Sequence, residues 1–346
     1  MPFFAKLYFN LKYTVMNHLF PTRYSMLSAD ALKSTIAERY GIPLEHCKLK
    51  LHGVSDTYIL QTADEKYIFK VYRAAHRSLE ELEGEVALLQ ILKDQDAKIS
   101  WPIADTNGHF IQAFPVAEGV KHGILYTYAK GTVSQVPDDT QLEVVGREMA
   151  FNHDILSTIE LPYPRMVYDL ETIAHRPMQL LKPAFEEYYP EGYTLLQQAT
   201  ENALAKLNQT DTSAFSYGYC HYDYFPKNFF FDENNKLTLF DFDFAGKGFL
   251  MNDPASLHVF YYLLRSVGRV DKTAADNSFG VFMKTYKAYR TVSEAEEAMI
   301  PVLGYLLLLF YLGYQYEHFE DWSNSFFGAR YLQERVGLMV QYAKEY

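Results

Sequence analysis

The sequence predicts an α+β protein of two lobes, with a small N-lobe built on an antiparallel sheet and a larger, mainly helical C-lobe. Between Cys47 and Tyr72 short β-type runs alternate with turn-prone residues, which is the pattern of a meander. Beyond Gly131 apolar residues recur at helical spacing, apart from a strand-like island at 219–244. The 346 residues are enough for two such lobes with sizeable cores.

The N-lobe elements follow one another in a regular order. Residues 1–28 precede the lobe as an extension, and the first twenty are aromatic but interrupted by Lys and Asn, which favours an extra helix over a signal peptide. The N-lobe itself spans 29–130 and begins with a helix at Ala29–Tyr40, which Gly41 ends. We expect strands at 48–52, 57–61, 67–72, 109–114 and 124–128, with a helix at 80–92 before the last two.

The C-lobe, residues 131–346, is expected to be helical on both sides of the strand-like island. The clearest early helices are predicted at 140–157 and 191–207. The stretch Met299–Tyr314 is strongly apolar, but it is shorter than the ~20 residues that a membrane span needs, and it contains Pro301. We therefore expect a buried core helix here and no membrane partner.

Charge and cysteine content exclude several classes of protein. The net charge is −11, and no stretch concentrates Lys and Arg, so the basic surface of a nucleic-acid binder is not expected. Cys47 and Cys220 are far apart and lack the spacing of a metal or redox motif, which argues against a disulfide framework or a zinc site. A cytoplasmic location fits this composition best.

The most informative segment runs from His221 to Gly248 and reads HYDYFPKNFFFDENNKLTLFDFDFAGKG. Two apolar stretches flank a polar turn, which predicts a β-hairpin. Asn228, at the start of one strand, can then lie beside Asp241, at the end of the other. An amide oxygen and a carboxylate are hard ligands of the kind that Mg²⁺ accepts, with phosphate oxygens and water completing its shell. Asp223, in the loop just ahead, is left free to receive a proton.

The order of these residues matches the H-x-D-x-x-x-x-N loop and the later metal aspartate of protein kinases. The chain resembles the superfamily of aminoglycoside phosphotransferases, choline kinases and type II homoserine kinases, over roughly residues 30–320. Pro226 inside the loop, Asp243 in Asp-Phe-Asp and the following Asp253 resemble this group more than protein kinases. The resemblance implies the protein-kinase-like fold, in which an ATP-dependent kinase phosphorylates a hydroxyl of a small molecule.

The resemblance also implies a nucleotide site in the N-lobe. Lys70, in YIFKVY, is similar to the lysine that holds the α- and β-phosphates, and Glu85 in the next helix is similar to its ion-pair partner. Glu81, one turn earlier on the same face, stays an alternative to Glu85. The turn HGVSDTY occupies the position of the nucleotide-covering loop, where backbone N–H groups of Ser55 and Asp56 would hold phosphate.

A hinge strand is implied where the N-lobe ends. Tyr126 and Tyr128 lie in this segment, which would offer backbone groups to adenine. The implied cofactors are ATP or GTP and Mg²⁺. In the implied mechanism, Asp223 orients and deprotonates the acceptor, His221 braces the loop, and Asp243 reaches a second metal or the substrate.

Three other functions stay open at this point. Asp241-Phe242-Asp243 also satisfies the D-x-D metal motif of a glycosyltransferase, although that reading leaves Lys70 and Asp223 unexplained. A pseudokinase that binds nucleotide as an interaction module is a second alternative, because the covering turn has a single glycine. A Ser/Thr protein kinase of the same superfamily is the third.

Some conspicuous residues have ordinary structural interpretations. Asp253 precedes Pro254 and is as readily explained as a helix N-cap as by a catalytic role. His153 is expected to be a satisfied packing residue rather than a ligand. The run Glu317–Trp322 mixes acids with aromatic side chains, which makes a cationic acceptor plausible.

Overall fold

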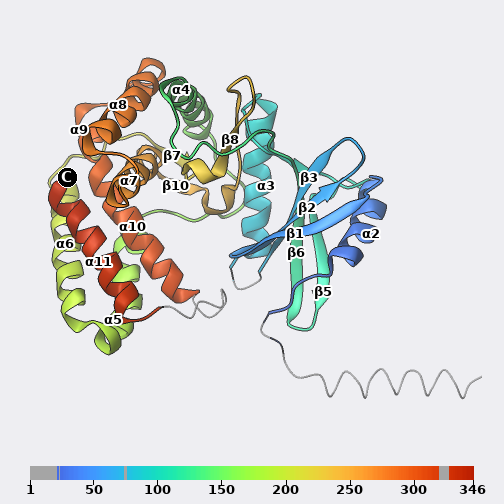
Figure 1. Cartoon of the computed structure of the whole chain (residues 1–346), viewed down its shortest axis with the longest axis horizontal. Coiled ribbons are helices and arrows are strands. Elements are labelled where there is room, and N and C mark those ends of the chain that lie inside the picture. The colour runs from blue at the N-terminus through green and yellow to red at the C-terminus, as the bar shows by residue number, and fades with distance from the viewer. Residues whose placement is uncertain (1–21, 23, 74–75, 319–326) are drawn as a thin grey trace, which may run out of the picture.

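The computed structural model of the chain describes residues 22, 24–73, 76–318 and 327–346. A smaller lobe built on a sheet lies beside a larger helical lobe (Figure 1). The predicted fold class, a two-lobed α+β protein, is confirmed. The helix expected in the first twenty residues lies outside the described residues.

The N-lobe is built on one antiparallel sheet. In the described part of the chain six strands form it, in the order β1-β2-β3-β6-β4, and β5 also pairs with β6. The strands are β1 His46–His52, β2 Ser55–Gln61, β3 Lys66–Tyr72, β4 Pro102–Ile103, β5 Ile111–Val116 and β6 Gly119–Thr127. The five predicted strands are present with shifted ends. The two-residue β4 was not predicted, because so short a segment has no periodicity to detect.

Alternation along β3 sorts its side chains onto two faces of the sheet. Phe69 and Val71 pack in the core that α2 (Ala29–Tyr40) covers, whereas Tyr72 packs with α3 (Leu79–Asp94). Lys70 therefore shares the α3 side, which is the side that faces the C-lobe (Figure 1). The predicted bounds of α2 agree with the structure.

Helices α2 and α3 both begin at serine caps. Ser28 caps α2, and Gly41, with a φ of 65°, ends it in the left-handed conformation that glycine tolerates. Ser78 and Glu81 form a capping box at the start of α3, in which each side chain accepts from the other's backbone N–H. Glu81 is thereby committed to the helix terminus.

The C-lobe is mainly helical, as predicted. Its helices are α4 Asp139–Leu156, α5 Arg176–Tyr188, α6 Pro190–Asn208, α7 Asn252–Ser266, α8 Lys272–Tyr289, α9 Glu294–Ala298, α10 Ile300–Glu317 and α11 Ala329–Glu345. Helix α10 is buried along most of its length, as expected for the apolar stretch Met299–Tyr314 that makes up most of it. No helix in the described residues is long and apolar enough to cross a membrane.

Short strands in the C-lobe carry the loops of interest. Strand β7 (Tyr217–Cys220) pairs with β10 (Gly246–Phe249), and β8 (Phe229–Phe231) pairs with β9 (Leu237–Leu239). The predicted hairpin is thus present. Asp232 stabilises its turn, because its Oδ1 accepts from the backbone N–H groups of Asn234 and Lys236 at 2.9 and 2.8 Å.

The segment that joins the lobes is fastened to this hairpin. Thr132 and Phe231 exchange two backbone hydrogen bonds of 3.1 Å. Gly131 has a φ of 102°, and a Cβ at this position would lie 2.1 Å from the carbonyl oxygen of Phe231. Only glycine allows so close an approach with this backbone conformation.

Candidate active site

Lys70 joins the two lobes by a direct ion pair. Its Nζ lies 2.6 Å from Asp241 Oδ1 and 3.6 Å from Asp243 Oδ2, although the residues are far apart in the sequence. Burial of the ammonium disfavours its charged form, but the carboxylates of Asp241 and Asp243 outweigh this and raise the pKa of Lys70. The lysine is therefore charged and aimed at the loop that follows β9.

Asp223 is held through both of its carboxylate oxygens. Oδ2 accepts from Asn228 Nδ2 at 2.7 Å and from Lys227 Nζ at 2.9 Å. Oδ1 accepts from the hydroxyl of Tyr311 at 2.9 Å. The side chain is buried and its orientation is fixed, as required of a group that must meet a reacting hydroxyl. Sequence reasoning missed Tyr311, because no motif marks this residue in the middle of α10.

The loop that carries Asp223 is supported from beneath by Asp253 on α7. The Asp253 carboxylate accepts from the backbone N–H of His221 at 2.9 Å and of Tyr222 at 2.7 Å. It also accepts from His153 Nε2 at 3.0 Å. The capping interpretation of Asp253 is wrong, because Met251 occupies the N-cap position of α7 without a side-chain cap, and the Asp253 carboxylate binds the loop instead.

Both histidines near this loop have structural partners. His221 Nε2 donates to the carbonyl oxygen of Phe240 at 3.0 Å, which ties the loop to the end of the hairpin. His153 is fully buried, and its Nδ1 meets the hydroxyl of Tyr286 at 2.8 Å. His153 is a satisfied packing residue, as the sequence suggested.

Asn228 and Asp241 offer oxygen atoms at the same end of the hairpin. The backbone N–H of Phe240 donates to the Asn228 carbonyl at 2.8 Å, which places Asp241 directly beside Asn228 along the paired chains. Asn228 uses its Nδ2 on Asp223, which leaves its amide oxygen for another partner. Asp241 has a φ of 65°, and 42% of its side chain is exposed. Partial burial raises the pKa of Asp241, but the ammonium of Lys70 more than offsets this and lowers it overall.

This donor set suits a magnesium ion that a nucleotide brings with it. In the described residues, no cluster of three or more His, Cys, Asp or Glu side chains could hold a metal unaided. An amide oxygen and an ionised carboxylate are hard ligands, and Mg²⁺ usually takes only one or two protein ligands besides phosphate and water. The chemistry of Asn228 and Asp241 therefore fits the expected ion.

Asp243 differs from Asp241 because cationic or polar donors occupy both of its oxygens. His76 Nε2 lies 2.9 Å from Oδ2, and Arg77 Nε lies 2.9 Å from Oδ1. Only 4% of Asp243 is exposed. Burial raises the pKa of this carboxyl, but His76, Lys70 and Arg77 together hold it well below its usual range. The structure does not leave Asp243 open to a metal, contrary to the sequence-based expectation.

Glu85 lies near Lys70 without pairing with it. Its Oε1 accepts from the hydroxyls of Tyr72 at 2.9 Å and Tyr126 at 2.8 Å. Among the described residues Lys70 forms ion pairs with Asp241 and Asp243, so the expected direct pair with Glu85 is not made here. The Glu85 carboxylate still contributes to raising the pKa of Lys70. Glu85 is therefore the buried carboxylate of α3 beside the lysine.

The covering turn places Ser55 and Asp56 on opposite faces of the sheet. Ser55 lies opposite Tyr72 on β3 and shares the face of Lys70. Asp56 lies between His52 of β1 and Val71 of β3, and its carboxylate is fully buried on the other face. The carboxylate of Asp56 thus does not face the nucleotide side, and the predicted role of the Ser55 and Asp56 backbone N–H groups stays a prediction.

The two tyrosines of the expected hinge also have different surroundings. Tyr126 is flanked by Ile68 of β3 and Pro102 of β4, and its backbone lies inside the sheet. Tyr128 follows the end of β6, and the ammonium of Lys66 lies 5.6 Å from the centre of its ring. Tyr128 is therefore the first residue after β6 whose backbone lies outside the sheet.

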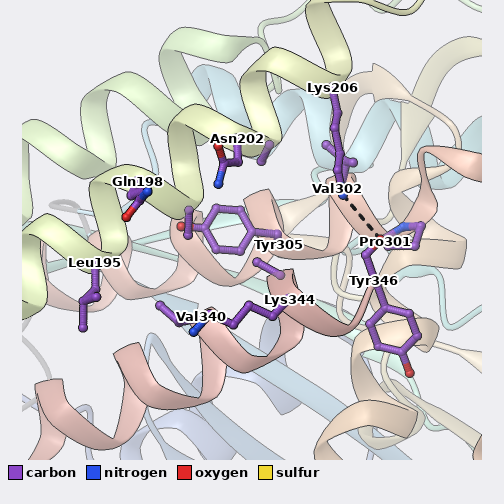
Figure 2. Close-up of a pocket in the computed structure, with 13 residues that line it drawn as sticks. Leu195, Gln198, Asn202, Lys206, Pro301, Val302, Tyr305, Val340, Lys344 and Tyr346 are labelled. Carbon is purple, nitrogen blue, oxygen red and sulfur yellow. Dashed lines mark hydrogen bonds between the residues drawn. The ribbon is translucent and has the colours of Figure 1, made fainter.

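Several cavities open on the described helices, and two of them bear on where an acceptor could bind. One, of about 240 Å³, lies between the start of α3, the start of α5 and the end of α10. Its polar lining includes His76, Arg77, Glu81, Arg176, Tyr314 and Glu317. We call it the interlobe cavity. The other, of about 220 Å³, lies between α6, α10 and α11, where Figure 2 shows Tyr305 near Asn202 and Val302 near Lys206.

Comparison with known proteins decides the family. Residues 47–281 match the model of the family described as "Phosphotransferase enzyme family". The chain belongs to this family. Its predicted enzyme class, a kinase that phosphorylates an alcohol group, is thereby confirmed, as is the predicted resemblance.

Similar proteins share most of the length of this phosphotransferase. Amicoumacin kinase of Bacillus subtilis is 26% identical over 275 residues, covering 77% of this chain and 78% of the relative. An amicoumacin kinase solved with AMP-PNP, Ca²⁺ and Ami superposes with a TM-score of 0.74 at 19% identity, over 91% of this chain and 94% of the other. A microcompartment-associated aminopropanol kinase superposes with a TM-score of 0.73 at 18% identity, over 92% and 97%. These superpositions show the shared fold.

Proposed function

We propose that this phosphotransferase moves the γ-phosphate of ATP onto a hydroxyl of a small acceptor that carries an amine. The observation that carries the proposal is Asp223, fixed through both oxygens beside the Asn228 and Asp241 oxygen ligands, with Lys70 paired to Asp241. Aminopropanol, named for one structural neighbour, combines a hydroxyl with an amine. The proposed acceptor has that combination.

Each residue has a definite task in this mechanism. Asp223 orients the acceptor hydroxyl and takes its proton, and Tyr311 and Asn228 keep the carboxylate aimed. Lys70 binds the α- and β-phosphates. Asn228 and Asp241 would hold Mg²⁺, which when bound neutralises charge on the β- and γ-phosphate oxygens. The protein thus contributes positioning and electrostatic stabilisation.

The remaining nucleotide contacts are assigned to the edge of the N-lobe sheet. Ser55 faces the same side as Lys70, and the turn just before it would cover the phosphates with its backbone. Tyr128 begins the segment that would meet the adenine. Three predicted residues lie behind this surface. Asp56 and Tyr126 act through the sheet, and Glu85 acts through the electrostatic environment of Lys70.

The interlobe cavity is the proposed acceptor site. Helix α10 connects it to Asp223, because Tyr311 contacts the aspartate and Tyr314, one turn later, lines the cavity. Glu317, which pairs with Arg176 at the cavity, would supply the carboxylate for an amine. The cavity between α6 and α11 is lined only by C-lobe residues, whereas residues of both lobes line the interlobe cavity, and this favours the interlobe cavity.

Metal-dependent ATP turnover with a panel of acceptors tests the proposal. The panel contains amino alcohols, choline, homoserine and aminoglycosides, with sugars as hydroxyl compounds that lack an amine. We expect turnover with an amine-bearing acceptor, and a loss of about 10²- to 10⁴-fold in kcat for Asp223→Asn, the range for a positioned general base. Glu317→Gln should raise the acceptor KM without changing the KM for ATP.

Matched controls separate this outcome from general damage. Asn202→Ala, in the cavity between α6 and α11, should leave every kinetic parameter unchanged. Mg·ATP binding without turnover for any acceptor would favour the pseudokinase, and turnover only with a Ser/Thr peptide would favour a protein kinase. Failure to bind Mg·ATP would refute the proposal.

A further inference from the structure

We propose that Asp243 is the centre of a clamp between the lobes, which positions Lys70 over the metal loop, rather than a metal ligand. The clamp consists of Asp243, His76, Arg77 and Tyr314. This inference rests on the proposed function for its meaning in catalysis. The contacts of the clamp are observed in the structure and do not depend on the proposed function.

The clamp joins three segments that are distant in the sequence. His76 and Arg77 belong to the turn between β3 and α3 in the N-lobe, and Asp243 belongs to the loop after β9 in the C-lobe. Tyr314 on α10 adds a hydrogen bond between its hydroxyl and His76. Each of these side chains is more than nine-tenths buried. The clamp is therefore a buried polar contact across the lobe boundary.

Hydrogen-bond directions in the clamp are consistent with a neutral histidine. The Tyr314 hydroxyl donates to His76 Nδ1, and His76 Nε2 then carries the proton that it donates to Asp243. Burial lowers the pKa of His76 despite the attraction of Asp243, which supports this protonation state. The aspartate thus receives one bond from a neutral donor and one from the Arg77 guanidinium.

Arg77 grips the peptide of Asp243 as well as its side chain. Its Nε donates to Oδ1 at 2.9 Å, and its Nη2 donates to the backbone carbonyl at 2.8 Å. Arg165, also buried, donates to the same carbonyl at 2.8 Å. Two guanidinium groups therefore fix the backbone of Asp243, two residues after Asp241.

Charge balance explains why the clamp controls Lys70. Lys70 and Arg77 carry two positive charges, and Asp241 and Asp243 carry two negative charges, within one continuous set of ion pairs. If Asp243 bound a metal instead, the buried guanidinium of Arg77 would lose its closest carboxylate, at 2.9 Å, and in the described part of the chain keep only the ion pair with Glu81 at 3.9 Å, which is unfavourable for a buried charge. Without the Asp243 carboxylate, Asp241 would be the one ion-pair partner left to Lys70 among the described residues, and Glu85 would attract the lysine without a direct contact.

Mn²⁺ and AMP-PNP binding to the full chain tests the inference, with calorimetry for the nucleotide and electron paramagnetic resonance for the metal. In Asp241→Asn we expect Mn²⁺ affinity in the presence of AMP-PNP to fall at least 30-fold. In Asp243→Asn we expect it to stay within threefold of the wild type, while the affinity for AMP-PNP falls at least tenfold. A loss of Mn²⁺ affinity in Asp243→Asn as large as in Asp241→Asn would make Asp243 a ligand and overturn the clamp.

Two Arg77 variants keep the test decisive if Asp243→Asn does not fold. Arg77→Lys retains the charge and should keep AMP-PNP affinity within about threefold, whereas Arg77→Met should lose at least tenfold with unchanged Mn²⁺ affinity. Equal AMP-PNP affinities for Arg77→Met and the wild type would also overturn the clamp. A general loss of folding would not separate metal affinity from nucleotide affinity in this way.

A second measurement separates this inference from the proposed function. If the wild type binds no Mn²⁺ and AMP-PNP, the proposed function fails, and small-angle X-ray scattering of the free chain then judges the clamp. We expect a larger radius of gyration for Arg77→Met than for Arg77→Lys, because the lobes part when the buried tie is lost. Identical radii would overturn the inference.

Discussion

The catalytic loop, residues 221–228, and Gly53 and Val54 at the tip of the covering turn are proposed to face the same site, but the structure holds them very differently. The catalytic loop is fastened by the buried carboxylate of Asp253 and by the Ser256 hydroxyl, which donates to the Tyr222 carbonyl at 2.9 Å. The covering turn has a single 3.2 Å hydrogen bond from Gly53 N–H to the Ser55 carbonyl, and it follows an exposed Leu51.

The difference separates two requirements of phosphoryl transfer. A base must be aimed to within a fraction of an ångström, so its loop rests on buried hydrogen bonds that are costly to break. A cover must open for the nucleotide, and a segment with few buried contacts opens at low free energy. The fold meets the first requirement with helix α7 and the second with the edge of the N-lobe sheet.

The largest expected effect comes from removing the support of the catalytic loop. Asp253→Ala leaves two buried backbone N–H groups and His153 without their acceptor, so we expect the free energy of unfolding to fall by about 4 kcal/mol. Turnover by the folded fraction should fall at least tenfold. Urea unfolding and single-turnover assays measure the two effects. Asp276→Ala, at an exposed ion pair, is the matched control, and an equal loss there would contradict the comparison.

A substitution at Gly131, in the segment that joins the lobes, should lower the free energy of unfolding almost as much. In Gly131→Ala, the new Cβ meets the Phe231 carbonyl oxygen and the residue keeps a φ of 102°, so we expect a loss of about 3 kcal/mol. Thermal unfolding measures it. Gly108→Ala is the control, because that glycine also has a positive φ but nothing within 4 Å of an added Cβ. Equal losses in both variants would assign the effect to the φ angle rather than to the contact with the hairpin.

Acid should weaken the helix that supports the catalytic loop. Burial lowers the pKa of His258 on α7 to about 4, and its Nδ1 accepts from the Tyr342 hydroxyl at 2.7 Å. Below pH 6.5 this histidine is protonated in the unfolded chain but stays neutral in the folded chain, so stability falls as the pH falls from 6.5 towards 4. At pH 5 the loss in the free energy of unfolding is about 2 kcal/mol.

Comparison with a variant that does not titrate isolates this contribution. His258→Gln can still accept from Tyr342, and the difference between its stabilities at pH 7 and pH 5 should be smaller than that of the wild type by about 2 kcal/mol. Urea unfolding at both pH values gives the difference. Parallel pH dependences for the two proteins would show that His258 does not titrate in this range.

The covering turn should tolerate change best. Val54→Ala alters a half-buried side chain in a turn with one backbone bond, so we expect a change in stability within about 0.5 kcal/mol. The KM for ATP should change by less than threefold. A loss above 2 kcal/mol would mean that the turn is as firmly held as the catalytic loop, and the contrast between them would fail.

Much of this architecture could be predicted from local patterns. Strand alternation, helical periodicity and the hairpin around Asp232 are encoded within short windows, so these elements were found with small errors at their ends. Helix α5 was missed, because it contains Pro177 and Pro183, which count against a helix, and because a π-helical turn at Glu171–His175 leads into it. Tertiary packing overrides these local preferences.

The site was predictable where its residues share a motif and unpredictable where they meet only in space. Asp223, Asn228 and Asp241 belong to one run of the sequence. His76 and Tyr311 reach this site from other elements, and no local signal marks them. Glu85 was expected to pair with Lys70. Instead, Glu85 accepts hydrogen bonds from two tyrosine hydroxyls, and Lys70 pairs with Asp241.

Helix α10 carries residues with three different roles on three successive turns. Tyr311 aims the base, Tyr314 supports His76, and Glu317 lies at the cavity beside Arg176. If the interlobe cavity takes the acceptor, as proposed, substitutions in the last turn would change the acceptor preference while the contact between Tyr311 and Asp223, two turns away, keeps its geometry. Acceptor preference and transfer chemistry could then vary independently along one helix.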